Sequence, residues 1–352
     1  MKRAWLAWFA VAALVSACAS APTTPAPTAA EATALPTPSP APTAQNVEPT
    51  ATAKTTPEVS KRLKAVATFS VIADWLRNVA GDRVEVFTLA GAEVEPHDYE
   101  PAPQDSVRLA EADLVFEIGA GFETWLDRLF TASGSRAQRV VLSEGLTLRP
   151  FAHEHEHEGG EHKEGDHEHK EGEHGHGELD PHVWQNPLNV VRIVERMAEA
   201  LKAADPAGAE TYARNAARYA EQLRALDAEI EQLVARIPEE RRKIATSHEA
   251  LGYFADRYGF EIIRVFVAPS EANQPSAQSI AEVVARLREE KVTVIFGESV
   301  GDAPALESIA REVGAKIGPP LFTDALFAAG KPGSTYLDAM RYNARTLVDA
   351  LQ

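Results

Sequence analysis

Short apolar runs alternate with helical patterns twice along the chain, once on each side of a long helical segment. Strands that alternate with helices are typical of parallel sheets in α/β proteins. We therefore predict two (β/α) lobes, each with its own parallel sheet. The predicted strands are Ala65–Phe69, Val84–Leu89, Asp113–Ile118 and Arg139–Leu142 in the first set, and Lys243–Ser247, Ile262–Val267, Val292–Phe296 and Ala315–Ile317 in the second. The predicted helices are Val71–Ala80, Phe122–Ser133, Gln278–Glu289, Ala303–Val313 and Ser334–Leu351.

A seam of apolar and small residues predicts one long helix between the two sets. Its members alternate in spacing between four and three residues, which places them on one face of a helix. Asp205-Pro206 favours a start and Pro238 an end. A coiled-coil dimer would use the same pattern, but a seam this short favours a rigid linking helix, 207–236, between an N-terminal lobe (62–206) and a C-terminal lobe (237–352). The seam consists of Tyr212, Ala216, Tyr219, Leu223, Leu226, Ile230 and Leu233.

Residues 1–18 predict export and lipid anchoring. Lys2 and Arg3 precede an apolar stretch from Ala4 to Val15 that is too short for a stable membrane span. The stretch ends in VSAC, which looks like a bacterial lipobox, and its Cys18 is the only cysteine of the chain. An ordinary signal peptide with a chance cysteine is the alternative. A lipid on Cys18 would hold the protein outside the cytoplasm, on the periplasmic side or cell surface.

The segment that follows Cys18 lacks the composition of a folded domain. Between Ala19 and Pro57 there are 9 Pro, 10 Thr and 11 Ala. Such a segment has no pattern that could bury a core, so residues 19–61 are predicted to be a disordered tether.

The charge of the chain argues against one class of partner. Lys and Arg number 35 against 52 Asp and Glu, a formal net charge of −17 over 352 residues. Nucleic-acid binding needs a basic face that displaces counterions from phosphates, so we expect no nucleic-acid partner.

Eight of the 11 histidines lie in one segment, 152–178, together with ten acidic residues and two lysines. A segment with this charge is predicted to be a flexible loop. Imidazoles beside carboxylates bind Zn²⁺, Ni²⁺ or Cu²⁺ loosely, so the loop is an auxiliary metal site, with a merely solvated acidic loop as the alternative. These histidines are His153, His155, His157, His162, His167, His169, His174 and His176.

The other three histidines are His97, His182 and His248. Each lies just beyond a predicted strand or at the start of a predicted helix. Ligands of doubly wound sheets bind beyond the carboxyl ends of the strands, which is where these three side chains would converge.

Four motifs carry a family resemblance: PHDYEP, DPHVWQNP, SHEALGYFADRYG and FTDALF. They resemble the metal-specific solute-binding proteins of bacterial ABC importers, zinc-uptake type (cluster A-I). The similarity runs from about Leu63 to the C-terminus. It implies two lobes joined by one rigid helix, with a metal in the cleft between them. It also implies an extracytoplasmic protein that captures Zn²⁺ and delivers it to the membrane permease and ATPase of an importer.

The resemblance also implies a ligand set. His97 matches the histidine of PHxYEP, His182 that of DPHxW, and His248 the position before the GYF helix; the fourth ligand is Asp324. Three imidazoles and one carboxylate suit tetrahedral Zn²⁺, whereas Mn²⁺ prefers more oxygen ligands. Relatives that carry Mn²⁺ or Fe²⁺ have Glu at the third position, and such a member is the alternative.

Two details complete the expectations for this site. The sequence Gln185-Asn186-Pro187 departs from the more usual Leu-Asp-Pro, a change expected to affect contacts around the ligands rather than the ligands. Glu298, after a predicted strand, is expected to support the site or contact the other lobe.

Two other functions share the same histidines. An extracellular zinc hydrolase would leave one metal position for water and use Glu249 or Glu298 as its general base. No predicted helix carries an HExxH motif, and a fourth ligand from Asp324 would block the open position, so we do not expect an enzyme. A zinc-storage lipoprotein or surface adhesin would need no permease. The protein is expected to be a monomer.

Overall fold

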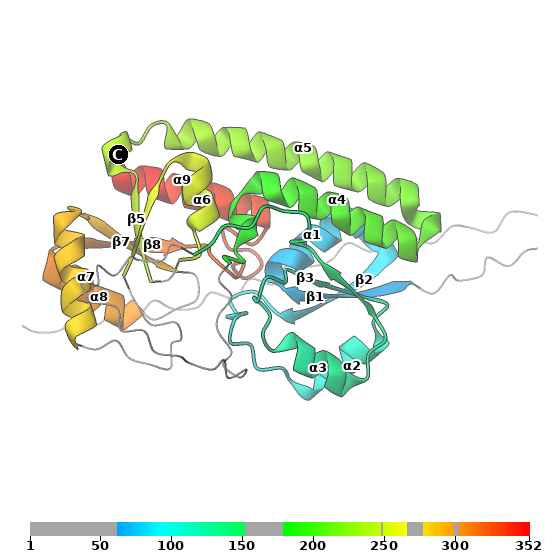
Figure 1. Cartoon of the computed structure of the whole chain (residues 1–352). Coiled ribbons are helices and arrows are strands. Elements are labelled where there is room, and N and C mark those ends of the chain that lie inside the picture. Colours follow the sequence, from blue (N-terminus) through cyan, green and yellow to red (C-terminus); the bar gives the residue numbers. More distant parts are fainter. Residues whose placement is uncertain (1–61, 152–178, 248, 266–276, 299–302) are drawn as a thin grey trace, which may run out of the picture. The chain divides into compact units, whose positions relative to one another are not determined.

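The computed structural model describes residues 62–151, 179–247, 249–265, 277–298 and 303–352 (Figure 1). Cys18 with the export signal, the 19–61 tether, the His-rich segment 152–178 and His248 lie outside these residues, and what the sequence predicts for them stays a prediction. Within the described part of the chain, no helix combines the length and the apolar character that crossing a bilayer requires.

The first lobe contains a four-stranded parallel sheet in the order β2-β1-β3-β4. Side chains alternate between its faces, as the two-residue period of a strand requires. Ala65, Ala67 and Phe69 pack in one core cluster, whereas Val66 and Val115 pack in another with residues of α2 and α3. The elements are β1 (Leu63–Phe69), α1 (Ser70–Ala80), β2 (Val84–Ala90), α2 (Pro103–Glu111), β3 (Leu114–Glu117), α3 (Leu126–Ser133) and β4 (Gln138–Val141).

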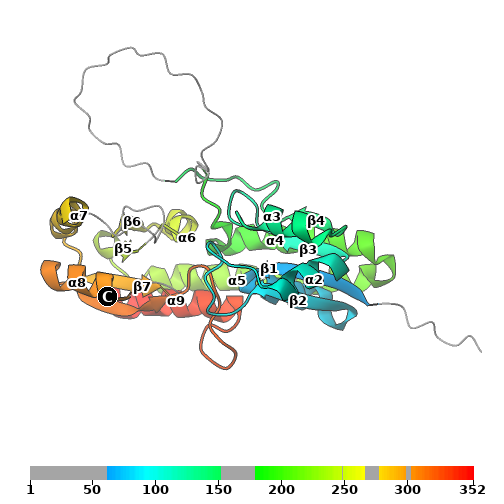
Figure 2. The same cartoon turned by 90° about the horizontal axis from the view of Figure 1, so that it is seen from below.

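The second lobe repeats this plan with a parallel sheet in the order β6-β5-β7-β8. Ile295 of the sheet packs with Leu287 of α7 and Ile309 of α8, while Phe296 belongs to the opposite cluster. Helices α7 and α8 lie at the end of the molecule away from α2 and α3 (Figure 2). The elements are β5 (Lys243–Thr246), α6 (Gly252–Tyr258), β6 (Glu261–Arg264), α7 (Ala277–Glu289), β7 (Val294–Glu298), α8 (Ala303–Val313), β8 (Lys316–Leu321) and α9 (Tyr336–Leu351). Two parallel-sheet α/β lobes are thus confirmed.

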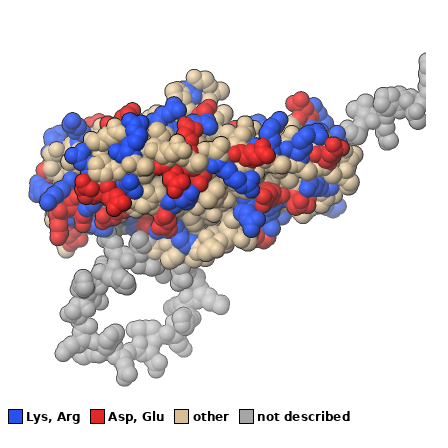
Figure 3. Space-filling view, turned by 90° about the horizontal axis from the view of Figure 1, so that it is seen from above, with Lys and Arg blue, Asp and Glu red and all other residues tan. Residues whose placement is uncertain are grey.

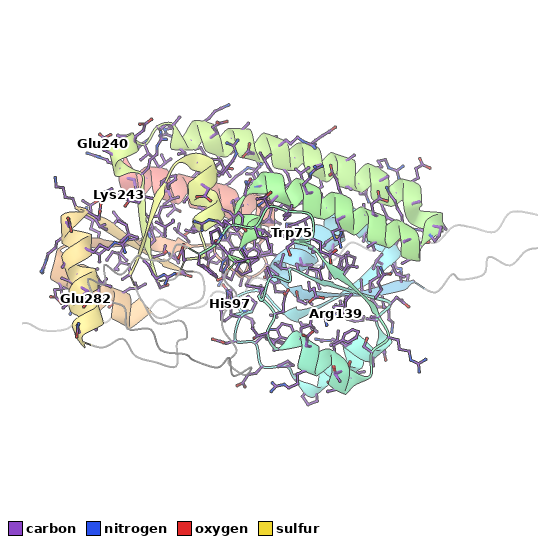
Figure 4. The ribbon with its side chains drawn as sticks, viewed as in Figure 1. Trp75, His97, Arg139, Glu240, Lys243 and Glu282 are labelled. Atoms are coloured by element: carbon purple, nitrogen blue, oxygen red, sulfur yellow. The ribbon has the colours of Figure 1, made fainter. Side chains whose placement is uncertain are left out.

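The chain between the two sheets forms two long helices, α4 (Pro187–Ala204) and α5 (Ala209–Val234). These helices pack side by side (Figure 1). The predicted seam is the buried face of α5, where Tyr212, Leu223 and Ile230 have no exposed surface. This face packs on α4, α1 and α9, so it serves this chain's own core. That core is one cluster containing residues of both lobes. Trp75 of α1, which is labelled in Figure 4, packs edge-on against Tyr336 of α9 with ring centroids 5.5 Å apart.

Helices α2 and α4 are not predicted from the sequence, and α6 is expected only through the family resemblance, as the GYF helix. α2 and α6 are short, with nine and seven residues, which leaves little room for a helical period. α4 has start signals that lie inside the DPHVWQNP motif: the Asn186 side chain accepts a hydrogen bond from the Leu188 N–H, and Pro187 opens the first turn. The helix predicted from Phe122 begins only at Leu126, because residues 119–125 form a turn.

Charged side chains of both signs intermix on the face that bears α5 (Figure 3). Many of them form exposed pairs, such as Arg214 with Glu210. Pairs of this kind stabilise a fold by less than about 1 kcal/mol each, so the apolar core holds the lobes together.

Candidate metal centre

Three predicted ligands meet at one place: His97, His182 and Asp324. The two Nε2 atoms lie 3.2 Å apart. Asp324 places Oδ1 3.5 Å from His182 Nε2 and Oδ2 4.0 Å from His97 Nε2. Metal–ligand bonds of about 2.0–2.2 Å place the ligand atoms of a tetrahedral ion about 3.3–3.5 Å apart, so these atoms can share one ion.

His97 lies in the loop between β2 and α2, and the loop's own motif holds it. Trp125 Nε1 donates a hydrogen bond to the Pro96 carbonyl at 2.8 Å, and Tyr99 donates to Asp105 at 2.8 Å. The His97 N–H donates to Glu95 at 3.0 Å. The side chain of His97 is 33% exposed, which makes it the accessible member of the three predicted ligands.

His182 is buried and oriented by Asp180. Asp180 Oδ1 lies 2.7 Å from His182 Nδ1 and 2.9 Å from the His182 backbone N. Burial alone would raise the pKa of Asp180, but its bonds with His182 and Arg149 outweigh burial and hold that pKa below the usual range. An ionised Asp180 accepts a hydrogen bond from Nδ1–H, which favours the tautomer whose Nε2 carries a lone pair and can bind a metal ion.

Asp324 follows β8 and has no exposed surface. The backbone before it is clamped by Asn343 of α9, whose side chain accepts from the Phe322 N–H at 2.8 Å and donates to the Phe322 carbonyl at 2.7 Å. The carboxylate is therefore held in place by the strand end and the last helix together.

Side chains that follow His182 bind the main chain next to Asp324, and so connect the predicted ligands of the two lobes. Trp184 Nε1 and Gln185 Nε2 each donate to the Thr323 carbonyl at 2.7 Å, directly before Asp324. Gln185 belongs to the sequence that departs from the usual Leu-Asp-Pro, so the departure does act on the support of a ligand. A further bond runs from the Glu93 N–H to the Leu326 carbonyl at 2.9 Å.

Aromatic rings surround the imidazoles. Phe122 lies edge-on to His97 with centroids 4.4 Å apart, and Trp184 lies 5.2 Å from His182 and 5.0 Å from Phe122. Phe122 and Trp184 are fully buried. They restrict the rotation of both imidazoles and lower the local dielectric, which strengthens electrostatic attraction to a cation.

Two acidic side chains whose roles the sequence leaves open, Glu298 and Glu249, make contacts outside the cluster of predicted ligands. Glu298 accepts hydrogen bonds from Ser247 and, at 3.2 Å, from Thr323. Glu249 pairs with Arg264 at 2.5 Å. The described part of the chain brings neither into the ligand cluster. His248 lies outside the described residues, so its role as third ligand stays a prediction, as do those of the eight loop histidines.

Several supporting residues are missed by sequence reasoning. Asp180 stands two residues before His182 in DPHVW, a spacing that could have identified it as the orienting carboxylate. Arg149 and Asn343 contact their partners across long stretches of chain, and no local pattern marks them.

Comparison with known proteins identifies relatives over most of the chain. Residues 65–350 match the family model described as zinc-uptake complex component A, periplasmic (ZnuA). The iron-binding protein YfeA of Yersinia pestis is 35% identical over 294 residues, 82% of this chain and 86% of that protein. The manganese-binding lipoprotein MntA of Halalkalibacterium halodurans is 32% identical over 84% of this chain and 91% of its own length.

Solved structures share the fold. The periplasmic zinc-binding protein TroA from Treponema pallidum superposes with a TM-score of 0.71 at 29% identity, covering 83% of this chain and 99% of that one. A Mn-bound periplasmic metal-binding protein from Candidatus Liberibacter asiaticus gives 0.70 at 26% identity, covering 82% and 100%.

Proposed function

Because the chain belongs to the ZnuA family of periplasmic metal-binding proteins of ABC transporters, we propose that it captures Zn²⁺ and delivers it to a zinc importer. Proteins of this family bind a transporter's substrate and are not enzymes, so the hydrolase alternative is set aside. The protein is extracytoplasmic and lipid-anchored, as its lipoprotein relatives are. Such proteins work with a membrane permease and an ATPase.

The convergence of two imidazole nitrogens and one buried carboxylate carries the proposal. With His248 as the predicted third imidazole, the donor set would be three nitrogens and one carboxylate. Zn²⁺ accepts this set in tetrahedral geometry, whereas Mn²⁺ favours carboxylate, carbonyl and water oxygens. The relatives named for iron and manganese favour the alternative, a family member that carries Mn²⁺ or Fe²⁺ in the same cleft.

The decisive measurement is Zn²⁺/Mn²⁺ competition on the chain without residues 152–178. We expect one tight Zn²⁺ per chain that Mn²⁺ does not displace, and a lower total of bound zinc than in the full chain. Loss of the tight site with the loop, or preference for Mn²⁺, would overturn the proposal.

Substitutions test the ligand set. Asp324→Ala should abolish tight binding, while Asp338→Ala, which removes an exposed carboxylate on α9, should leave it unchanged. His248→Glu should shift the preference toward Mn²⁺, because it replaces a nitrogen ligand with oxygen. Equal affinity in Asp324→Ala and the parent would exclude Asp324 as a ligand.

A further inference from the structure

The guanidinium of Arg149 stands among three carboxylates beside the metal centre. Its Nη1 lies 2.9 Å from Asp180 Oδ2 and 3.7 Å from Glu249 Oε1, and its Nε lies 3.0 Å from Asp256 Oδ2. Arg149 and Asp180 flank the His-rich segment on the first-lobe side, whereas Glu249 and Asp256 belong to the second lobe. One side chain therefore joins the carboxylate that orients His182 to the other half of the molecule.

Hydrogen bonds also hold the backbone of Arg149 next to the backbone of Asp180. The Tyr253 hydroxyl accepts from the Arg149 N–H at 3.0 Å and donates to the Asp180 carbonyl at 2.9 Å. The Asp180 N–H in turn donates to the Arg149 carbonyl at 2.8 Å. Backbone and side chain of Arg149 are thus both held against Asp180, so the guanidinium has a defined place rather than a choice of surface partners.

Gly252, at the start of α6, provides the space for the guanidinium. A Cβ at this position would lie 1.6 Å from Arg149 Nη1 and 2.7 Å from Asp180 Oδ2. Any side chain here would therefore displace Arg149 from Asp180. The absence of a Cβ at Gly252 is an independent sign that the contact between Arg149 and Asp180 is a built feature.

We propose that Arg149 is a positioning residue for metal binding: it fixes Asp180, and thereby His182, and couples that pair to the second lobe through Glu249 and Asp256. The inference rests on the proposed function in taking His182 as a ligand. Groups that orient a metal-binding imidazole typically change metal affinity by about 10–100-fold when they are removed. Loss of Arg149 should act on metal affinity and on metal dissociation more than on the fold.

The test compares four variants of the full chain with the parent. Arg149→Met removes the charge, Arg149→Lys keeps a charge without the planar fork, and Gly252→Ala displaces the guanidinium. The matched control is Arg257→Met. Arg257 is an arginine of α6 that pairs with Asp227 at 2.6 and 2.9 Å and makes no contact with Asp180 among the described hydrogen bonds.

The readouts are Zn²⁺ affinity, Zn²⁺ release to a chelator, urea unfolding of the metal-free protein, and the visible spectrum of bound Co²⁺. Co²⁺ is added below one equivalent so that it fills the tightest site.

We expect Arg149→Met and Gly252→Ala to weaken Zn²⁺ binding by about 10–100-fold, to speed release and to alter the Co²⁺ spectrum. Arg149→Lys should restore part of the affinity, and Arg257→Met should bind as the parent does. Parental affinity and spectrum in the Arg149 and Gly252 variants would overturn the positioning role, as would an equal loss in Arg257→Met. If Arg149→Met does not fold, Arg149→Lys and Gly252→Ala decide the question. A parent without any tight site would instead refute the proposed function.

Discussion

Glu123 should make the protein less stable as the pH rises from about 4.5 to 8, because its carboxyl is buried in the first lobe, next in the chain to Phe122. Its Oε1 accepts from Thr68 Oγ1 and from the Ile118 N–H, both at 2.8 Å, and its Oε2 accepts from the Gly119 N–H at 3.0 Å. Burial raises the pKa of Glu123 from 4.5 to about 7, although these three donors oppose the change.

The size of the effect follows from this pKa. A carboxyl with a raised pKa binds its proton more tightly in the folded chain than in the unfolded chain. Its contribution is complete below pH 4.5 and is lost as the pH rises through about 7, at about 1.36 kcal/mol per pH unit. Over this interval of about 2.5 units, the contribution of Glu123 to the free energy of unfolding should fall by about 3 kcal/mol.

Urea unfolding between pH 4.5 and 8 measures this loss in the parent and in Glu123→Gln. In the variant, the side-chain NH2 group faces the Gly119 N–H, so that donor loses its acceptor. This loss lowers the free energy of unfolding by about 1–3 kcal/mol at every pH. The advantage of the parent over the variant should therefore shrink by about 3 kcal/mol across the range.

Asp205→Asn is the control for this titration. Hydrogen bonds from Tyr212 and Arg83 lower the pKa of Asp205, so its contribution is present above its unfolded pKa and is lost only toward acid. Its curve should run parallel to that of the parent above pH 5. A constant difference between the parent and Glu123→Gln over the whole range would refute the reasoning.

Three further outcomes are expected. Tyr336→Phe removes the hydroxyl that donates to the Trp184 carbonyl at 2.6 Å, so the free energy of unfolding in urea should fall by about 1–3 kcal/mol. Leu223→Ala, in the buried seam of α5, should cost about 2–5 kcal/mol in the same assay, whereas Glu221→Ala on the exposed face should change it by less than about 0.5 kcal/mol. X-ray scattering of metal-free and Zn²⁺-bound protein should give similar profiles, because hydrogen bonds already join the lobes beside the ligands; a large closure would contradict this.

The sheets could be predicted because their signal is local. Each predicted strand overlaps an observed one, since short apolar runs between turn signals suffice to identify a buried parallel strand. The seam of α5 is equally local. The short helix α6 could not be found in this way, because its seven residues are placed by packing of Phe254 and Tyr258 in the shared core rather than by a periodic pattern.

The site shows the same limit. His97 and His182 stand in recognisable motifs, and Asp324 is reached through family resemblance alone, since one acidic residue after a strand has no distinctive pattern. Apart from Asp180, which stands in the same motif as His182, the residues that support the predicted ligands carry no local signal. Arg149 forms an ion pair with Glu249, and Trp184 donates a hydrogen bond to the Thr323 carbonyl. Both contacts exist only because two lobes that are distant in sequence fold against each other.

The core that both lobes share determines when this protein can finish folding. α9 is the last of the described elements to be synthesised, yet its Tyr336 covers Trp75 of α1 and bonds to Trp184 beside His182. The first lobe therefore cannot complete its packing while α9 is still being made or is still crossing the membrane. The backbone before Asp324 likewise gains its clamp from Asn343 only when α9 is in place, so the third corner of the predicted metal centre is completed by the end of the chain.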